Sequence, residues 1–174
     1  MKRYLKKCLV NHLAGTQGPQ VLELGIGDGE ILSELPGLLP GVQLSAMDVN
    51  QTLIDYCRDR IAPNQASFYC QDLSNPWSED HRNSFDAVYS LQSFHDFGGL
   101  EALRSTYEEI ALVLKPGGVL INADFVVPLP QDKQAAPRRF PVEMHLQLLK
   151  DCGFEQSRVI HEEGLLGCIS ASRS

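Results

Sequence analysis

The sequence predicts an α/β fold: a mostly parallel sheet of seven strands, helices on both faces, and an antiparallel hairpin at the C-terminal end. Short apolar runs of strand length alternate with amphipathic segments of helical period along the 174 residues. The last two strand segments are joined only by residues 163–164, which favours a hairpin. At roughly 150 residues per domain, the length predicts one domain, 1–174.

Residues 2–13 are predicted to form the first helix, because leucines recur on one face and lysines on the other. After breakers at 15–19, Val21 to Leu24 form a buried strand that ends at Gly25. The next helix, around residues 31–35, is expected to stop at Pro36.

A second strand over 42–47 ends at Asp48, and Asn50 is a suitable amino-terminal cap for the helix that follows. Pro63 closes that helix, and a third strand near 66–70 leads to Asp72. Residues 74–84 are polar and irregular.

The fourth strand covers 85–90 and is followed by a helix that residues 115–118, Lys-Pro-Gly-Gly, are expected to end. A fifth strand over 119–125 precedes a proline-rich connection at 127–141, and a last helix runs from Pro141 to Gly153. The hairpin strands lie near 155–161 and 165–171. This amounts to five strand-plus-helix units, and the ligand crevice is expected at the carboxyl ends of the strands.

Charge and composition argue against several partners. With 15 Lys and Arg against 22 Asp and Glu, the net charge is −7, which is unfavourable for binding nucleic acid or an anionic membrane. No apolar run approaches the roughly 20 residues that span a bilayer, and no signal-peptide segment is present, so the chain is expected to be cytoplasmic. Its five cysteines and five histidines are scattered, which predicts no metal site.

The segment with the most functional information is 23–29, Glu-Leu-Gly-Ile-Gly-Asp-Gly, where the first strand turns into its helix. Glycine allows a tight turn and a close approach to a ligand, and free amides at a helix start favour an anionic group. A dinucleotide-binding turn would need a third glycine at position 30, which is Glu30.

Two aspartates follow the next two strands. Asp48 lies 23 residues after Gly25, where a carboxylate can accept hydrogen bonds from both hydroxyls of a ribose. Asp72, at the end of the third strand, lies within reach of an adenine amino group. Polar ends on three successive strands are improbable as a structural coincidence.

These features together resemble the class I S-adenosylmethionine-dependent methyltransferases of the small-molecule type. The similarity also includes the fourth-strand segment 85–90 and the Leu-Lys-Pro-Gly-Gly turn at 114–118, so it covers nearly the whole chain. It implies a Rossmann-like fold, S-adenosyl-L-methionine as cofactor, and in-line transfer of the methyl group to a small-molecule acceptor.

The resemblance also implies roles for residues around the nucleoside. Asp48 would bind the ribose, and Val49 would line the adenine pocket. Asp72 and the backbone amide of Leu73 would contact the adenine.

Around the methionine part, the resemblance places Gly25 and Gly27 along the ligand. Glu23 would face the ammonium group, directly or through water. Ser90 and Leu91, at the end of the fourth strand, would lie beside the sulfonium.

His95 is the candidate for contacting or deprotonating the acceptor, because many small-molecule members of the family carry a histidine in this region. A His-Asp pair before two glycines is also typical of a helix cap or an ordered turn. The place after the fourth strand reads Ser-Leu-Gln-Ser, without the Asn/Asp-Pro-Pro-aromatic signature of amino-group methyltransferases. We therefore expect a small metabolite as acceptor.

Two segments are candidates for covering the acceptor. The N-terminal helix and linker, 1–18, could form a lid, and the connection 127–141 carries Lys133, Arg138 and Arg139, which could meet an acidic acceptor. Two other functions remain open: a nicotinamide-dependent oxidoreductase, and a non-catalytic interaction module with a methyltransferase-like fold. The sequence leaves the oligomeric state and the methylated atom open.

Overall fold

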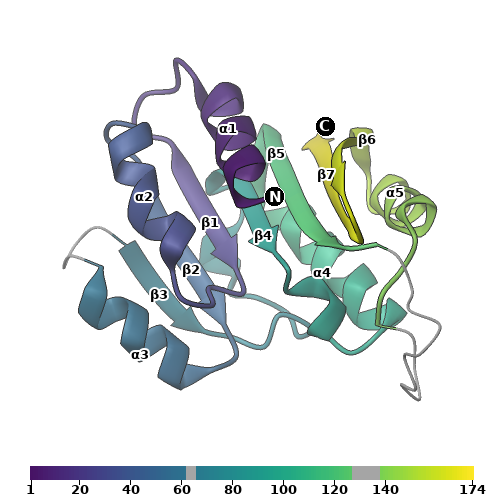
Figure 1. Ribbon diagram of the computed structural model, residues 1–174, viewed down its shortest axis with the longest axis horizontal. Helices are drawn as coiled ribbons and strands as arrows, with labels where there is room; N and C mark the ends of the chain where they lie inside the picture. The colour runs from purple at the N-terminus through teal and green to yellow at the C-terminus, as the bar shows by residue number, and fades with distance from the viewer. Residues whose placement is uncertain (62–65, 127–137) are drawn as a thin grey trace.

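A computed structural model describes residues 1–61, 66–126 and 138–174 and contains one seven-stranded sheet (Figure 1). Its strands are β1 (Gln20–Leu24), β2 (Gln43–Asp48), β3 (Ala66–Cys70), β4 (Phe85–Leu91), β5 (Leu114–Phe125), β6 (Phe154–Glu163) and β7 (Leu166–Arg173). The helices are α1 (Lys2–Leu13), α2 (Glu30–Leu38), α3 (Gln51–Arg60), α4 (Leu100–Val113) and α5 (Val142–Asp151). Two short 3-10 helices, η1 (Glu79–His81) and η2 (Phe94–Asp96), flank β4.

The strand order is β3-β2-β1-β4-β5-β7-β6, and β7 runs antiparallel to both of its neighbours. The predicted mostly parallel sheet with an antiparallel C-terminal hairpin is confirmed. Strand order reverses beside β1, which pairs with β2 on one side and β4 on the other. In such sheets, ligands usually bind where the strand order reverses, in the crevice outside the carboxyl ends of the strands.

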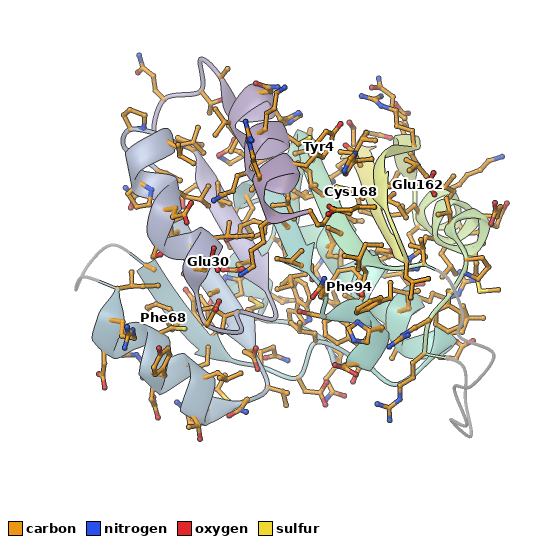
Figure 2. The ribbon with its side chains drawn as sticks, viewed as in Figure 1. Tyr4, Glu30, Phe68, Phe94, Glu162 and Cys168 are labelled. Carbon is orange, nitrogen blue, oxygen red and sulfur yellow. The ribbon has the colours of Figure 1, made fainter. Side chains whose placement is uncertain are left out.

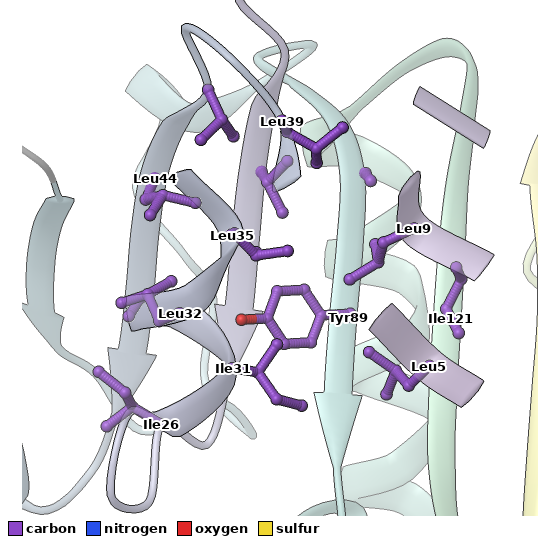
Figure 3. Close-up of a cluster of buried hydrophobic side chains, with 14 of the residues drawn as sticks. Leu5, Leu9, Ile26, Ile31, Leu32, Leu35, Leu39, Leu44, Tyr89 and Ile121 are labelled. Carbon is purple, nitrogen blue, oxygen red and sulfur yellow. The ribbon is translucent and has the colours of Figure 1, made fainter. Parts of the chain in front are cut away.

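Each face of the sheet carries its own apolar core, which explains why the strands read as nearly continuous apolar runs. Successive strand residues point to opposite faces, so Val21 joins the core under α1, α2 and α3, whereas Leu22 joins the core under α4 and α5. Figure 3 shows the first core, where Leu5 and Leu9 of α1 and Leu35 of α2 lie around Tyr89 of β4.

Helix α1 is packed against the sheet and also reaches the C-terminal strands. Tyr4 lies near Cys168 of β7 (Figure 2), and its hydroxyl donates to the carbonyl oxygen of Ile160 at 2.6 Å. The Tyr4 ring stacks on His161, with 4.3 Å between ring centroids. The predicted helix over 2–13 is confirmed.

The prediction that Pro36 stops the second helix was wrong, because α2 continues to Leu38. Proline lacks only its own N–H, so it removes the single bond to the Leu32 carbonyl. The N–H of Leu39 still donates to the Leu35 carbonyl at 2.8 Å, which completes the last turn beyond the proline.

Two further expectations needed correction. Residues 115–118 do not separate α4 from its strand but form an irregularity inside β5, where the pairing shifts from Phe85–Leu114 to Ala87–Val119. The ammonium of Lys115 donates to the Asp86 carboxylate at 2.8 Å across this irregularity. Between β3 and β4 the described chain forms only η1, so there are four strand-plus-helix units rather than five.

Several expectations fall outside the described residues: Pro63, and the connection 127–141 as far as residue 137, including Lys133. Within the ranges that are described, no helix is long and apolar enough to cross a bilayer.

Candidate active site

A cavity of about 780 Å³ opens at the carboxyl ends of β1, β2, β3 and β4. Its walls come from the segments that follow these four strands, together with Lys2 at the start of α1. The volume lies within the roughly 300–1,000 Å³ typical of small-molecule sites. The cavity therefore occupies the place where the strand order predicts a ligand.

The glycine turn after β1 forms one wall. Gly25, Gly27 and Gly29 all have positive φ, at 72°, 55° and 69°, a conformation that glycine adopts at little cost. A Cβ on Gly25 would lie 2.2 Å from the Ser93 Oγ, so this glycine lets the turn pack against the segment after β4. A Cβ on Gly27 would meet nothing within 4 Å, which leaves open space beside the backbone for a ligand.

Glu23 is a buried carboxyl group in the cavity wall, with 4% of its surface exposed. Its Oε2 atom has no hydrogen-bond partner among the described residues, and burial raises the pKa of Glu23 to about 8. Leaving a buried carboxyl oxygen unpaired is unfavourable, and a cationic group in the cavity would remove that penalty. This orphaned oxygen therefore fits the ammonium group of S-adenosylmethionine.

Asp48 and Val49 form the adjoining wall at the end of β2. Asp48 is 8% exposed, and its Oδ1 accepts a hydrogen bond from the Asn50 amide at 2.8 Å. Val49 is 68% exposed although it lines the cavity, so its side chain offers apolar surface to an incoming ring. Asn50 caps α3 by accepting from the amide of Thr52 at 3.0 Å, as predicted from the sequence.

Asp72 and Leu73 line the cavity after β3. Asp72 Oδ1 accepts from the Ser74 amide and hydroxyl at 3.0 and 2.7 Å, and these bonds hold the pKa of Asp72 below its usual range. The Leu73 carbonyl accepts from Trp77 Nε1 at 3.2 Å, which fixes the loop. Both residues line the same cavity as Val49.

Ser90 and Leu91 were expected side by side at the ligand, but only Leu91 lines the cavity. Ser90 is fully buried, and its hydroxyl donates to the Leu24 carbonyl at 3.0 Å, which ties β4 to β1. The cavity wall instead continues from Leu91 to Gln92 and Ser93. Ser90 is still inside the sheet, where side chains pack against a helix layer. The cavity begins only at the end of β4.

His95 lies in η2 at the edge of the site and is not among the residues that line the cavity, although Asp96 and Phe97 are. Its Nδ1 lies 2.7 Å from the Asp124 Oδ1, and its backbone amide donates to Asp124 Oδ2 at 3.0 Å. The hydrogen bond to Asp124 raises the pKa of His95. The distance from His95 Nε2 to Asp96 Oδ2 is longer, 3.5 Å.

Sequence reasoning missed Asp124 as the partner of His95, because 29 residues separate them and β5 alone places the carboxylate there. It also missed Lys2, whose ammonium donates to the Glu30 carboxylate at the cavity edge. The helix considered as a lid lies against β4, β5 and α2, and only its first residue reaches the cavity. Gln92 and Ser93 had one usable signal, their position directly after the buried strand β4, whereas Phe97 follows η2 and had none.

A family model, described as a methyltransferase domain, matches residues 21–118, more than half of the chain. The chain belongs to the methyltransferase domain family. The predicted membership of the class I S-adenosylmethionine-dependent methyltransferases, with S-adenosylmethionine as the cofactor, is thereby confirmed. In the described part of this methyltransferase, no group of three or more His, Cys, Asp or Glu side chains could hold a metal ion.

Two curated relatives illustrate the similarity. A malonyl-[acyl-carrier protein] O-methyltransferase of Bacillus cereus is 24% identical over 148 residues, which cover 84% of this chain and 52% of that protein. A fatty-acid O-methyltransferase of Mycolicibacterium smegmatis is 31% identical over 114 residues, covering 64% of this chain and 39% of that protein. The chain thus spans about half, or less, of the length of these relatives.

Solved structures share the fold of this methyltransferase. The CurJ carbon methyltransferase superposes with a TM-score of 0.83 at 15% identity, covering all of this chain and 54% of that one. A SAM-dependent methyltransferase from Aquifex aeolicus gives 0.75 at 19% identity, covering 97% of this chain and 89% of that one.

Proposed function

We propose that this methyltransferase transfers the methyl group of S-adenosylmethionine in line to a small-molecule acceptor. The observation that carries the proposal is the pair of buried carboxyl groups, Glu23 and Asp48, on either side of a glycine turn that leaves open space at Gly27. A cationic amino-acid end and a ribose are the two parts of the donor that need carboxyl groups as partners.

Each donor contact is assigned to a residue in the cavity wall. Glu23 would accept from the ammonium group, and Asp48 from the ribose hydroxyls. Asp72 and the Leu73 amide would contact the adenine, whose face Val49 would cover. Gly25 and Gly27 would lie along the methionine part, and Leu91 would lie beside the sulfonium. Ser90 would act indirectly, because its bond to the Leu24 carbonyl joins β4 to β1.

The chain's own contribution to the reaction is positioning. When bound, the donor supplies a methyl group on a positively charged sulfur, which is already activated towards a nucleophile. Residues that hold the reactants in line can supply up to roughly 7–11 kcal/mol in favourable cases. Leu91 and Phe97 line the cavity and would offer apolar surface beside the reacting groups.

We assign His95 to the acceptor side, as a contact whose ring is held in place by Asp124 through Nδ1. The hydrogen bond to Asp124 raises the pKa of His95 and orients the imidazole. A base is needed only for an acceptor that must lose a proton during transfer.

The class of acceptor is supported by charge and by the relatives. A net charge of −7 disfavours nucleic acid. Two relatives are named for malonyl-[acyl-carrier protein] and fatty-acid substrates, which are acyl compounds. A small acyl or related metabolite is therefore the acceptor we propose.

Calorimetry with S-adenosylhomocysteine tests the donor site. The wild-type protein should bind it with micromolar affinity, and Asp48→Ala should weaken binding by at least about tenfold, since a charge-assisted hydrogen bond contributes roughly 1.5–3 kcal/mol. Asp55→Ala, an exposed aspartate on α3 that does not line the cavity, is the matched control and should bind like the wild type. Absence of binding heat in the wild type would refute the proposal.

Methyl transfer is tested separately, with an isotopically labelled donor and a metabolite extract analysed by mass spectrometry. A labelled product that depends on the wild-type protein is expected. Donor binding without any labelled product would favour a non-catalytic interaction module instead.

A further inference from the structure

Gln92 has a backbone conformation that side chains other than glycine rarely adopt. Its φ is +55°, in the left-handed region. The N–H of Gln92 donates to the Ala123 carbonyl at 2.7 Å, so the neighbouring strand β5 holds the residue in this conformation. Glycine would adopt it more easily than glutamine does.

Two other residues in the described ranges share this feature, and neither lies in the cavity. Asn83 belongs to a residue type that tolerates the left-handed region, and its side chain accepts a hydrogen bond from Arg173. Gln156 lies at an irregularity in the pairing of β6 with β7, where a bulge accounts for its backbone. Among the three, Gln92 alone lines the cavity. Strained residues held by their surroundings are frequent at functional sites.

The side chains that line the cavity offer many hydrogen-bond acceptors and few donors that are not already bonded within the described residues. Six carboxyl groups line it: Glu23, Asp28, Glu30, Asp48, Asp72 and Asp96. Most donors are already engaged, since Lys2 donates to Glu30, the Ser74 hydroxyl to Asp72, and the Ser93 hydroxyl to backbone carbonyls.

The side-chain amide of Gln92 differs from these donors, because it makes no hydrogen bond within the described residues. Asn50 also keeps amide hydrogens, but it follows Asp48 at the end of β2. Gln92 follows β4, on the opposite side of β1 from β2 and β3. It therefore lies on the other side of β1 from the carboxylates assigned to ribose and adenine, five residues before Phe97, which also lines the cavity.

We infer that Gln92 contacts the methyl acceptor and donates a hydrogen bond from its Nε2 amide to a carbonyl or carboxyl oxygen of that molecule. The inference rests on the proposed function and deepens it by naming the acceptor group. The Gln92 amide supplies a hydrogen-bond donor, so an oxygen atom on the bound molecule would be its partner. The carboxylates of the cavity already supply many hydrogen-bond acceptors.

The test uses the full chain and two substitutions with opposite effects on the backbone. Gln92→Gly relieves the conformation and removes the amide, so the melting temperature should rise by about 2–4 °C. Gln92→Met removes the amide but keeps a side chain of similar length, so the melting temperature should stay the same. In both variants methyl transfer from labelled S-adenosylmethionine to the extract component that the wild type labels most should fall about tenfold.

Donor binding provides the second readout. The dissociation constant for S-adenosylhomocysteine, measured by calorimetry, should change by less than about twofold in both variants, because Gln92 is assigned to the acceptor. Gln156→Gly is the matched control: it relieves the same conformation outside the cavity and should raise the melting temperature without changing transfer. The labelled product should contain a carbonyl or carboxyl group.

Wild-type transfer in Gln92→Gly and Gln92→Met would overturn the inference and leave the proposed function intact. So would a labelled product without a carbonyl or carboxyl group, or a parallel loss of donor binding. A wild-type protein that binds no donor, or that labels nothing, would instead overturn the proposed function and this inference with it.

Discussion

The position of Glu23 within β1 determines the burial and the pKa of its carboxyl group. It lies within β1 at 4% exposure, with one oxygen unpaired and the pKa raised to about 8 by burial. A carboxyl group in this state stays mostly protonated at neutral pH. Binding of a cation beside it favours the charged form, so ligand binding and proton release are coupled at this residue.

Replacing Glu23 should change the pH dependence of stability. The folded-state pKa is above the ordinary value of 4.5, so the folded state binds more protons, and the wild type loses stability as pH rises from about 5 to 8. Glu23→Gln should remove this loss, which is on the order of 3–5 kcal/mol in the free energy of unfolding. Urea unfolding at pH 5 and pH 8 measures the difference.

The matched control for this experiment is Glu108→Gln, an exposed glutamate on α4, which should keep the wild-type pH dependence. If Glu23→Gln and the wild type lose the same stability over this range, Glu23 is not protonated in the folded state. The same variant should also release fewer protons than the wild type when S-adenosylhomocysteine binds.

At the scale of elements, the turn between β1 and α2 forms one wall of the cavity. Gly25 has positive φ and faces the Ser93 side chain, whereas Gly27 has positive φ and faces open space. An alanine at Gly27 would therefore destabilise the protein only through its backbone conformation. An alanine at Gly25 would add a steric clash with Ser93.

Gly25→Ala should destabilise the protein by about 3 kcal/mol, because a positive φ and overpacking against Ser93 add together. Gly27→Ala should cost only about 1 kcal/mol, for the conformation alone. Chemical denaturation gives both values. Addition of Ser93→Gly to Gly25→Ala should recover part of the loss, and no recovery would show that the contact with Ser93 is not the cause.

At the scale of the whole molecule, α1 is part of the core rather than a detachable cover. Leu5, Leu9 and Leu13 are 0–2% exposed and belong to the same core as α2 and β4. The helix is also joined to α2 by the ion pairs Lys2–Glu30, which is half-exposed, and Lys6–Glu34, in which the Lys6 side chain is 19% exposed. Burial, rather than the ion pairs, is expected to hold α1 in place.

Leu9→Ala should therefore lower the free energy of unfolding by about 2–5 kcal/mol, whereas Lys6→Ala should lower it by less than about 1 kcal/mol. Thermal and urea unfolding of the two variants measure the contrast. If the two substitutions lower the free energy of unfolding equally, burial of the leucines is not the main interaction that holds α1 in place.

Local patterns in the sequence were sufficient to predict the sheet, the glycine turn and the acidic residues at the ends of β2 and β3. Apolar periodicity, capping by Asn50 and glycine positions are local properties, and parallel strands bring their carboxyl ends to one edge whatever their order. This is why Asp48 and Asp72 were expected at one crevice from the sequence, and both line the cavity. Glu23, which the family resemblance added, lines it as well.

Tertiary structure alone decided how side chains far apart in sequence meet. The bond of His95 to Asp124, the burial of Ser90 between strands and the position of Lys2 at the cavity depend on which strands become neighbours. The left-handed backbone of Gln92 is likewise held by Ala123 of β5. Such contacts form because packing brings distant segments together, and no local pattern along the chain encodes their geometry.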